Sequence, residues 1–481
     1  MKAILRHPVG LVGVLLLAVS GVVLLPSVAR AGGPGRWTNL CCDIQSAQAY
    51  GQASLVRTPD RLLHIIYAWE NEPDAAEDYY SVLSVGPEGA VLGGGVIPGF
   101  WGPLRGNPVL LPDGSGLRAL FSGGGDAPYS ANGAMYTATS PDGKTWSLFD
   151  GSMSHMRVAD ARSFGGVELG DGTPIASWVF HGSMYWHVGT DPGVPAGAGD
   201  DSFTLAQPGR WVTEGALALD PTTGEVWAVY HAATTGSSGG GIYARRIADP
   251  SGATDLGPEL HAPASSTAAG ASMSRLSVAT RTSGGIYAAY CAGAPRCASI
   301  RLWRVGAPTS TVVPRSVGAT EVDVSPGPAG RLWIAWLGSG RHTVFATRTG
   351  PGAHAFGAVR AMRGPGHHPS MDGLVVEGSR ARLDVVLYDE FFFHTQILPG
   401  LSLRASPSRF GDLTSHTVTF TVLDAGVPVE DALIRVAGHI ARTNVAGVAA
   451  ILFRSGFPTG SYIATASKGG YASAARRIHV T

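Results

Sequence analysis

A run of apolar residues that ends in an aromatic residue recurs along most of the chain. The seven copies lie at 65–67, 119–121, 176–178, 228–230, 288–290, 334–336 and 386–388. The closing aromatic residues are 46 to 60 residues apart. Self-similarity at a nearly constant spacing of this size indicates a series of equal structural units that pack side by side.

Polar turns divide each unit into short strands. A shorter apolar stretch and a turn rich in proline, aspartate and glycine precede most of the runs, as at 54–60 and 109–114. A third stretch follows, as at 135–139 and 184–188, and a fourth comes after another turn. Because proline and glycine preset turn dihedral angles, the pattern predicts tight hairpins. Four short antiparallel strands per unit are typical of β-propeller blades.

The first and last units complement each other. The seventh unit ends near residue 397 without a fourth strand, whereas 35–40 lies unpaired and resembles 144–148, which we expect to be the fourth strand of the second unit. We expect 35–40 to complete the last unit, because closure removes exposed strand edges. The sequence thus predicts an all-β, seven-bladed propeller over 32–400, with six blades as the alternative if one repeat is misassigned.

The pattern changes at about residue 401. Apolar and β-branched residues alternate over 417–422 and 426–436, and again over 460–471, between glycine and proline residues. Such alternation indicates strands with one buried face, and 401–481 is long enough for a small β-sandwich. This part resembles bacterial Ig-like or carboxypeptidase-regulatory-like domains, which implies a spacer, a stabilising module or an adhesive unit.

The first 31 residues have the form of a secretory signal peptide. Lys2 and Arg6 precede an apolar run at 11–25, and Ala29 and Ala31 form a small-residue cleavage site. The run is short for a membrane span, so we expect cleavage after Ala31 and no membrane insertion afterwards, with an uncleaved anchor as the alternative. The expected location is outside the cell or in the cell envelope.

Export permits disulfides, and the chain has four cysteines. Cys291 and Cys297 flank a turn between two strand-like stretches, so they are expected to form a disulfide across a hairpin. Cys41 and Cys42 are adjacent, and the sequence leaves their pairing open.

Composition excludes several classes of protein. Glycine and proline make up 99 of 481 residues and only 15% are charged, which excludes long surface helices. Thirty-five basic residues balance 35 acidic residues, so the charge excess that nucleic-acid binding needs is absent. No motif has the spacing of metal ligands or of a cofactor loop, and neither a metal nor a cofactor is expected.

One motif carries a family resemblance. The stretch 140–146, Ser-Pro-Asp-Gly-Lys-Thr-Trp, resembles the Asp-box turn of the sialidase-like (BNR-repeat) propellers, although it is one position shorter. In such a turn the carboxylate of Asp142 accepts backbone N–H groups and Trp146 packs between strands. The box therefore serves folding and does not act on a substrate.

The resemblance places ligands at the mouth of the ring, where the first strand of each blade begins. The residues expected near that ring are Gln52, Asn107, Arg162, Glu214, Arg275, Glu321 and His368. We expect Gln52, Asn107, Arg162, Arg275, His368 and the loop residue Tyr129 to bind ligand. Trp69 and Trp101 offer further stacking faces, with packing inside the blades as the alternative.

Sialidase activity needs an arginine ahead of the first strand, in an Arg-Ile-Pro motif, and this chain has Gly51-Gln52-Ala53 there. Glu214 and Glu321 are candidate catalytic carboxylates for another glycoside hydrolase, and the alternative is that both are solvated or ion-paired. The first expectation is therefore recognition of a glycan or an extracellular protein at the propeller mouth, with glycoside hydrolysis as the alternative.

Overall fold

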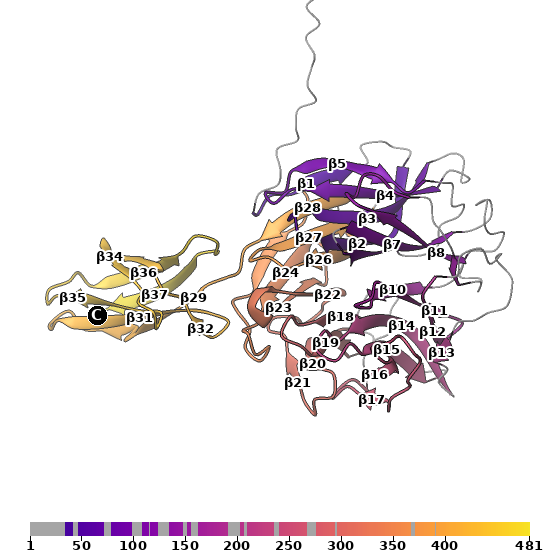
Figure 1. Ribbon diagram of the computed structural model, residues 1–481. Helices are drawn as coiled ribbons and strands as arrows, with labels where there is room; N and C mark the ends of the chain where they lie inside the picture. Colours follow the sequence, from indigo (N-terminus) through magenta and orange to yellow (C-terminus); the bar gives the residue numbers. More distant parts are fainter. Residues whose placement is uncertain are drawn as a thin grey trace, which may run out of the picture.

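The computed structural model describes residues 34–41, 47–71, 78–98, 108–114, 116–123, 134–147, 152–154, 162–190, 203–205, 209–234, 240–266, 276–293, 296–366, 371–389 and 391–481. These residues form strands almost throughout, and their single helix is the 3-10 turn η1 (Pro328–Gly330). No helix in these ranges is long and apolar enough to cross a membrane. The fold is all-β, as the sequence predicts (Figure 1).

Seven four-stranded antiparallel sheets, numbered I to VII here, follow one another along the chain. Sheet I contains β2 (Ala47–Arg57), β3 (Leu63–Asn71), β4 (Asp78–Val85) and β5 (Val91–Val96). Sheet II contains β6 (Val109–Asp113), β7 (Gly116–Gly123), β8 (Ala134–Ser140) and β9 (Ser152–Ser154). Sheet III contains β10 (Arg162–Glu168), β11 (Pro174–Phe180), β12 (Ser183–Val188) and β13 (Phe203–Leu205).

Sheet IV contains β14 (Arg210–Leu219), β15 (Val226–Thr234), β16 (Gly240–Ala248) and β17 (Leu260–His261). Sheet V contains β18 (Leu276–Thr280), β19 (Ile286–Ala292), β20 (Ser299–Arg304) and β21 (Ser310–Val312). Sheet VI contains β22 (Glu321–Pro326), β23 (Leu332–Leu337), β24 (Thr343–Arg348) and β25 (Arg360–Arg363). Sheet VII contains β26 (Gly373–Glu377), β27 (Leu383–Tyr388), β28 (Phe392–Ile397) and β1 (Thr38–Cys41).

Each of the seven repeated apolar runs lies in the second strand of a sheet. The closing aromatic side chains, from Tyr67 to Tyr388, are all buried. They fill the space between neighbouring sheets: Phe121 of sheet II packs on Tyr80 of sheet I with ring centroids 4.9 Å apart. Burial on both faces explains why these strands are continuously apolar and do not alternate.

The first strands form a ring. Strands β2, β6, β10, β14, β18, β22 and β26 contact one another in that order, and β26 contacts β2. A side chain of one first strand often accepts a backbone N–H from the next, as Ser54 does from Leu110, Ser163 from Gly215, Glu214 from Leu276, Ser277 from Val324 and Asp323 from Val376. Asp323 and Ser325 accept N–H groups from Val376 and Gly378 in the same order along both segments, so β22 and β26 run in the same direction and begin at the same end of the ring.

The N-terminal strand closes this ring. Strand β1 pairs antiparallel with β28, so residues near the two ends of the ring share one sheet, and the prediction for 35–40 is confirmed. The prediction for 144–148 is wrong, because the described residues of that stretch form a turn and β9 is the fourth strand of sheet II. The turn forms because Asp142 holds the backbone bent and removes it from the strand ladder.

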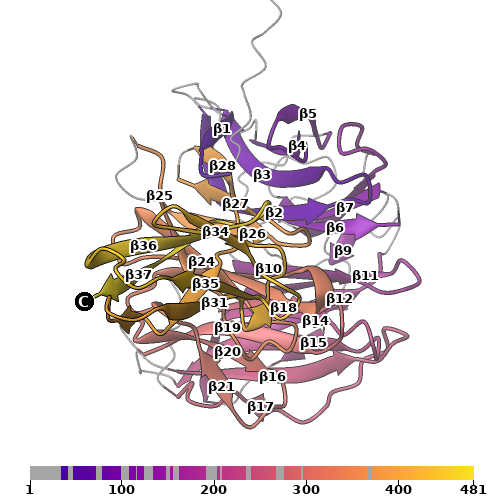
Figure 2. The ribbon, with the colours of Figure 1, turned by 90° about the vertical axis from the view of Figure 1, so that its left-hand side faces the viewer.

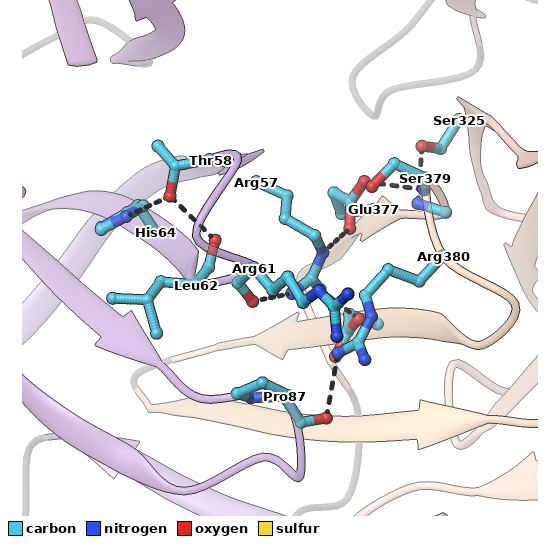
Figure 3. A network of polar contacts seen from close by, with 12 residues as sticks. Arg57, Thr58, Arg61, Leu62, His64, Pro87, Ser325, Glu377, Ser379 and Arg380 are labelled. Carbon is cyan, nitrogen blue, oxygen red and sulfur yellow. Dashed lines mark hydrogen bonds and ion pairs between the residues drawn. The ribbon is translucent and has the colours of Figure 1, made fainter. Parts of the chain in front are cut away.

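A buried polar network joins sheets I and VII beside this closure (Figure 3). The guanidinium group of Arg57, at the end of β2, donates to Glu377 over 2.7 Å and also to Asp384. Asp384 contacts His394 Nε2 at 2.9 Å and accepts an amide N–H from Gln396 at 3.0 Å. All five side chains are buried or nearly so, and the network joins the first and last sheets electrostatically.

Residues 401–481 form two further sheets, which pack as layers over a core that includes Phe420, Ile434, Ile451 and Ile478 (Figure 2). Sheet VIII contains β29 (Ser402–Ser406), β31 (His416–Asp424), β32 (Val427–Pro428) and β35 (Val448–Phe453). Sheet IX contains β30 (Arg409–Phe410), β37 (Ala474–Val480), β36 (Gly460–Ser467), β33 (Leu433–Val436) and β34 (His439–Arg442).

A buried ion cluster connects this C-terminal part to sheet VI. Asp424, at the end of β31, accepts from the guanidinium group of Arg348 and lies 3.5 Å from that of Arg331. The Arg348 guanidinium also lies over the rings of Trp333 and Tyr471, 5.7 and 5.4 Å from their centroids. Strand register places Arg331 and Arg348 at one end of sheet VI and Glu321 at the other end.

The predicted disulfide between Cys291 and Cys297 is present, with Cα atoms 5.3 Å apart. It joins β19 to the residues just before β20, as a hairpin link should. Residue 42 lies outside the described residues, as do the predicted signal peptide and its cleavage site.

Candidate functional site

Two of the predicted site residues have described side chains. Glu214 lies in β14 and Glu321 begins β22, so they occupy sheets IV and VI, separated by sheet V. Gln52 and Arg162 lie in β2 and β10, but their side chains are outside the described set. The other predicted residues, Asn107, Tyr129, Arg275 and His368, fall outside the described ranges, as do Trp101 and the side chain of Trp69.

Glu214 is a link between sheets. Its side chain is buried, and Oε1 accepts the backbone N–H of Leu276, the first residue of β18, over 3.1 Å. On the neighbouring strand, His231 lies opposite Glu214 and its Nδ1 is 2.6 Å from the Thr213 hydroxyl. The Glu214 carboxylate therefore stabilises the contact between β14 and β18, and this hydrogen bond offsets part of the cost of burying the carboxylate.

Glu321 belongs to a charged group at the same end of the ring. Its Oε1 is 4.0 Å from Nη2 of Arg341, which also donates to the backbone carbonyl of Asp372. Tyr388, at the end of β27, is buried beside them. Burial raises the pKa of the Tyr388 hydroxyl well above its usual value, and the negative charge of Glu321 raises it further. Tyr388 is therefore a neutral phenol at physiological pH.

Asp323 is a second buried carboxylate of β22 that joins three sheets. It accepts N–H groups from Val324 and Val376 at 2.8 and 2.7 Å and a hydroxyl proton from Ser277 at 2.5 Å. Burial raises the pKa of Asp323 to about 6, because these hydrogen bonds only partly offset the lost solvation.

This pKa predicts a pH-dependent stability. Between pH 4 and 6 folded Asp323 holds a proton that the unfolded chain has lost, so its contribution to stability falls as pH rises, by about 3 kcal/mol in all. As the pH rises from 4 to 6, we expect the unfolding free energy of the wild type to fall by about this amount relative to that of Asp323→Asn, which does not titrate at this position. Urea titrations at several pH values measure it, and parallel pH profiles for both proteins would contradict it.

An aromatic surface lies at the same end of the ring, at the start of β14. The Trp211 side chain is 53% exposed, which is unusual for a residue of this size. Gly182 lies flat against the indole, so that a Cβ built there would be 2.5 Å from Trp211 Cδ2, and its positive φ also excludes larger residues. The Val212 N–H donates to the Gly182 carbonyl over 2.8 Å and fixes the strand below the indole.

Charged and hydroxyl groups gather around Arg210, the residue that precedes Trp211 in β14. Arg210 forms an ion pair with Glu259 at 2.8 Å and lies over the Tyr243 ring, 4.4 Å from its centroid. The Tyr230 hydroxyl donates to Glu259 over 2.6 Å. Burial raises the pKa of Tyr230 far above its usual range, and the hydrogen bond to Glu259 adds to this effect. The repeat pattern does not single out Trp211 as a candidate site residue.

The turn at Asp142 is built as the resemblance implies. Oδ1 of Asp142 accepts the N–H groups of Lys144 and Thr145, each at 2.8 Å, and these bonds lower the pKa of the carboxyl. Trp146 is buried and its Nε1–H donates to the Gly143 carbonyl over 3.3 Å. The Asp142 carboxylate is thus occupied by its own turn.

Within the described part of the chain, no group of three or more His, Cys, Asp or Glu side chains is placed to hold a metal ion. The start of β14 instead carries the exposed indole of Trp211, next in sequence to Arg210 and its ion pair with Glu259.

No family model and no curated protein sequence matches this chain. Several solved structures are similar in fold. An α-L-arabinanase from Penicillium chrysogenum is 15% identical, with 65% of this chain and 93% of the arabinanase covered and a TM-score of 0.40. A Hadza microbial sialidase is 10% identical over 73% of this chain and 65% of the sialidase, with a TM-score of 0.37. The Dos1 propeller is 8% identical over 88% of this chain and 96% of its own, with a TM-score of 0.42. Likeness at this level assigns neither an activity nor a ligand.

Proposed function

We propose that this chain is a seven-bladed β-propeller, followed by an Ig-like sandwich, that binds a glycan at the end of the ring where the first strands begin. The ring of first strands and its closure by β1 support the propeller. The half-exposed indole of Trp211 supports the ligand class, because a flat aromatic face stacks on a sugar ring. The ion pair that Arg210, the preceding residue, forms with Glu259 offers polar groups that can bond sugar hydroxyls.

Removal of the indole tests this proposal. We expect Trp211→Ala to weaken binding of the best ligand on a glycan array by roughly tenfold or more, because the stacking face is lost. Phe203→Ala is the matched control, since Phe203 is also exposed, at 41%, but lies on the outer strand β13. Equal losses in both variants, or no glycan bound by the wild type, would contradict the proposal.

Glycoside hydrolysis is the second candidate, favoured by the buried carboxyl groups of Glu214 and Glu321 at the same end of the ring. Fluorogenic glycosides assayed with the same preparation distinguish the two functions. Under recognition, Glu214→Gln and Glu321→Gln keep most of the binding and no variant turns over substrate. Turnover by the wild type that either substitution abolishes would establish a hydrolase instead.

A further inference from the structure

The outer face of sheet IX combines arginine and isoleucine side chains. Ile434 and Val436 of β33, and Ile478 of β37, point into the sandwich core. Since side chains alternate along a strand, Arg435 and Arg477 point outward, and both are exposed. Ile440 and Ile463 lie on the same outer face and are 60% and 50% exposed.

Strand register orders these side chains into pairs. Arg435 lies directly opposite Ile440 of β34, and Arg477 lies opposite Ile463 of β36. The Cβ atom of each arginine therefore lies about 5 Å from the Cβ atom of an isoleucine across the ladder. Neither Arg435 nor Arg477 has an ion-pair partner among the described residues, whereas Arg442, on the same face, is paired with Asp431 at 2.7 Å.

The opposite face of the sandwich is different. On sheet VIII the outward positions of β31 are Thr417, Thr419 and Thr421, and their partners on β35 include Leu452. Arg404 of β29 is the charged residue that register places among them. The basic face is therefore a property of one sheet and not of the whole domain.

Charge in this part of the chain is also unbalanced. Residues 401–481 contain eight basic and four acidic residues, although the whole chain is neutral. Asp424 is already consumed by Arg348 of sheet VI, and Asp431 by Arg442. The other guanidinium groups of this domain therefore carry a net positive charge, which attracts an anionic partner.

We infer that the outer face of sheet IX binds an acidic polysaccharide, through carboxylate contacts to Arg435 and Arg477 and apolar contacts to Ile440 and Ile463. Guanidinium groups bind carboxylates in a planar, two-point geometry, and exposed isoleucine side chains offer apolar surface that a ligand can bury. The face contains neither the aromatic side chains that anchor proteins at a lipid interface nor those that stack on nucleic-acid bases.

Binding of polygalacturonate to the chain from residue 32 onward tests the inference, with dextran as the neutral polymer. We expect Arg435→Glu/Arg477→Glu to reduce affinity by about tenfold or more, and added salt to weaken the wild type. Arg404→Glu/Arg454→Glu is the matched control, because it makes the same charge change at exposed sites away from this face. We expect it to bind within about twofold of the wild type. An unchanged unfolding midpoint verifies that each variant folds.

Three results would overturn the inference. The first is that the wild type fails to bind polygalacturonate at low ionic strength. The second is that both double variants lose affinity equally. The third is that Arg435→Glu/Arg477→Glu weakens binding only to vesicles of phosphatidylglycerol and phosphatidylcholine and leaves binding to polygalacturonate unchanged. Trp211→Ala should retain polygalacturonate binding, which separates this surface from the propeller mouth.

Discussion

Replacement of Arg57 by alanine should destabilise the protein by about 3–5 kcal/mol, among the largest effects expected for a single substitution here. The guanidinium group lies between the carboxylates of Glu377 and Asp384, and all three side chains are at most 9% exposed. Without it, two buried carboxylates remain next to each other and lack their cation, while the contact between the first and last sheets is lost. Urea unfolding followed by tryptophan fluorescence measures the loss.

Arg246→Ala is the matched control for this substitution. Arg246 also joins two carboxylates, those of Glu225 and Asp255, each at 2.7 Å, but its side chain and theirs are between 24% and 47% exposed. Solvent screens these pairs, so the expected loss is much smaller than that of Arg57→Ala. If Arg57→Ala cost no more than Arg246→Ala, the network in Figure 3 would not stabilise the closure of the ring.

Asp424→Asn should cost a similar amount, about 3–5 kcal/mol, and should act on the connection between the propeller and the C-terminal sandwich. The substitution keeps the shape of the side chain but removes the charge that compensates Arg348 and Arg331. Burial already lowers the pKa of Arg331, which shows that the site disfavours an uncompensated cation. We expect the two domains to unfold at different denaturant concentrations, where the wild type unfolds them together.

The distribution of fluorophores makes this measurable. All 11 tryptophans precede residue 337, so tryptophan fluorescence reports the propeller, and cleavage by a protease near 398–401 reports separation of the sandwich. Asp431→Asn is the control, because Asp431 is 63% exposed and pairs with Arg442 at the surface. A single joint transition in Asp424→Asn, with cleavage as slow as in the wild type, would show that other contacts hold the domains together.

The sequence predicted much of the architecture because the architecture is repetitive. Seven apolar runs at similar spacing identify seven second strands, since each must be buried between two neighbouring sheets. The unpaired strand at the N-terminus and the missing strand at the end of the repeat were enough to predict that β1 joins β28. The stretch 144–148 was misassigned because its aromatic residue resembles a strand residue, whereas the hydrogen bonds of Asp142 make it a turn.

The site was less predictable, because it depends on contacts between residues far apart in the chain. Glu214 and Glu321 lie in first strands, Glu321 as the first residue of β22, but sequence could not show that Glu214 accepts a backbone N–H from sheet V or that Arg341 lies beside Glu321. Trp211 was missed because its indole packs against Gly182, which lies in the turn between β11 and β12 of a different sheet. An aromatic residue in a strand is ordinarily buried in the core. Its exposure to solvent can be recognised only from the tertiary packing around it.

Local patterning by itself therefore determined most of the strands, their order and the cross-linked hairpin of Cys291 and Cys297, because hydrophobic periodicity and turn chemistry act over a few residues. Only the tertiary structure decided how charge is distributed between interior and surface. Arg57, Arg348 and Arg435 are the same residue type, yet two are buried against carboxylates and one faces solvent. The side chains that pack around a guanidinium group determine that difference, and they come from distant parts of the chain.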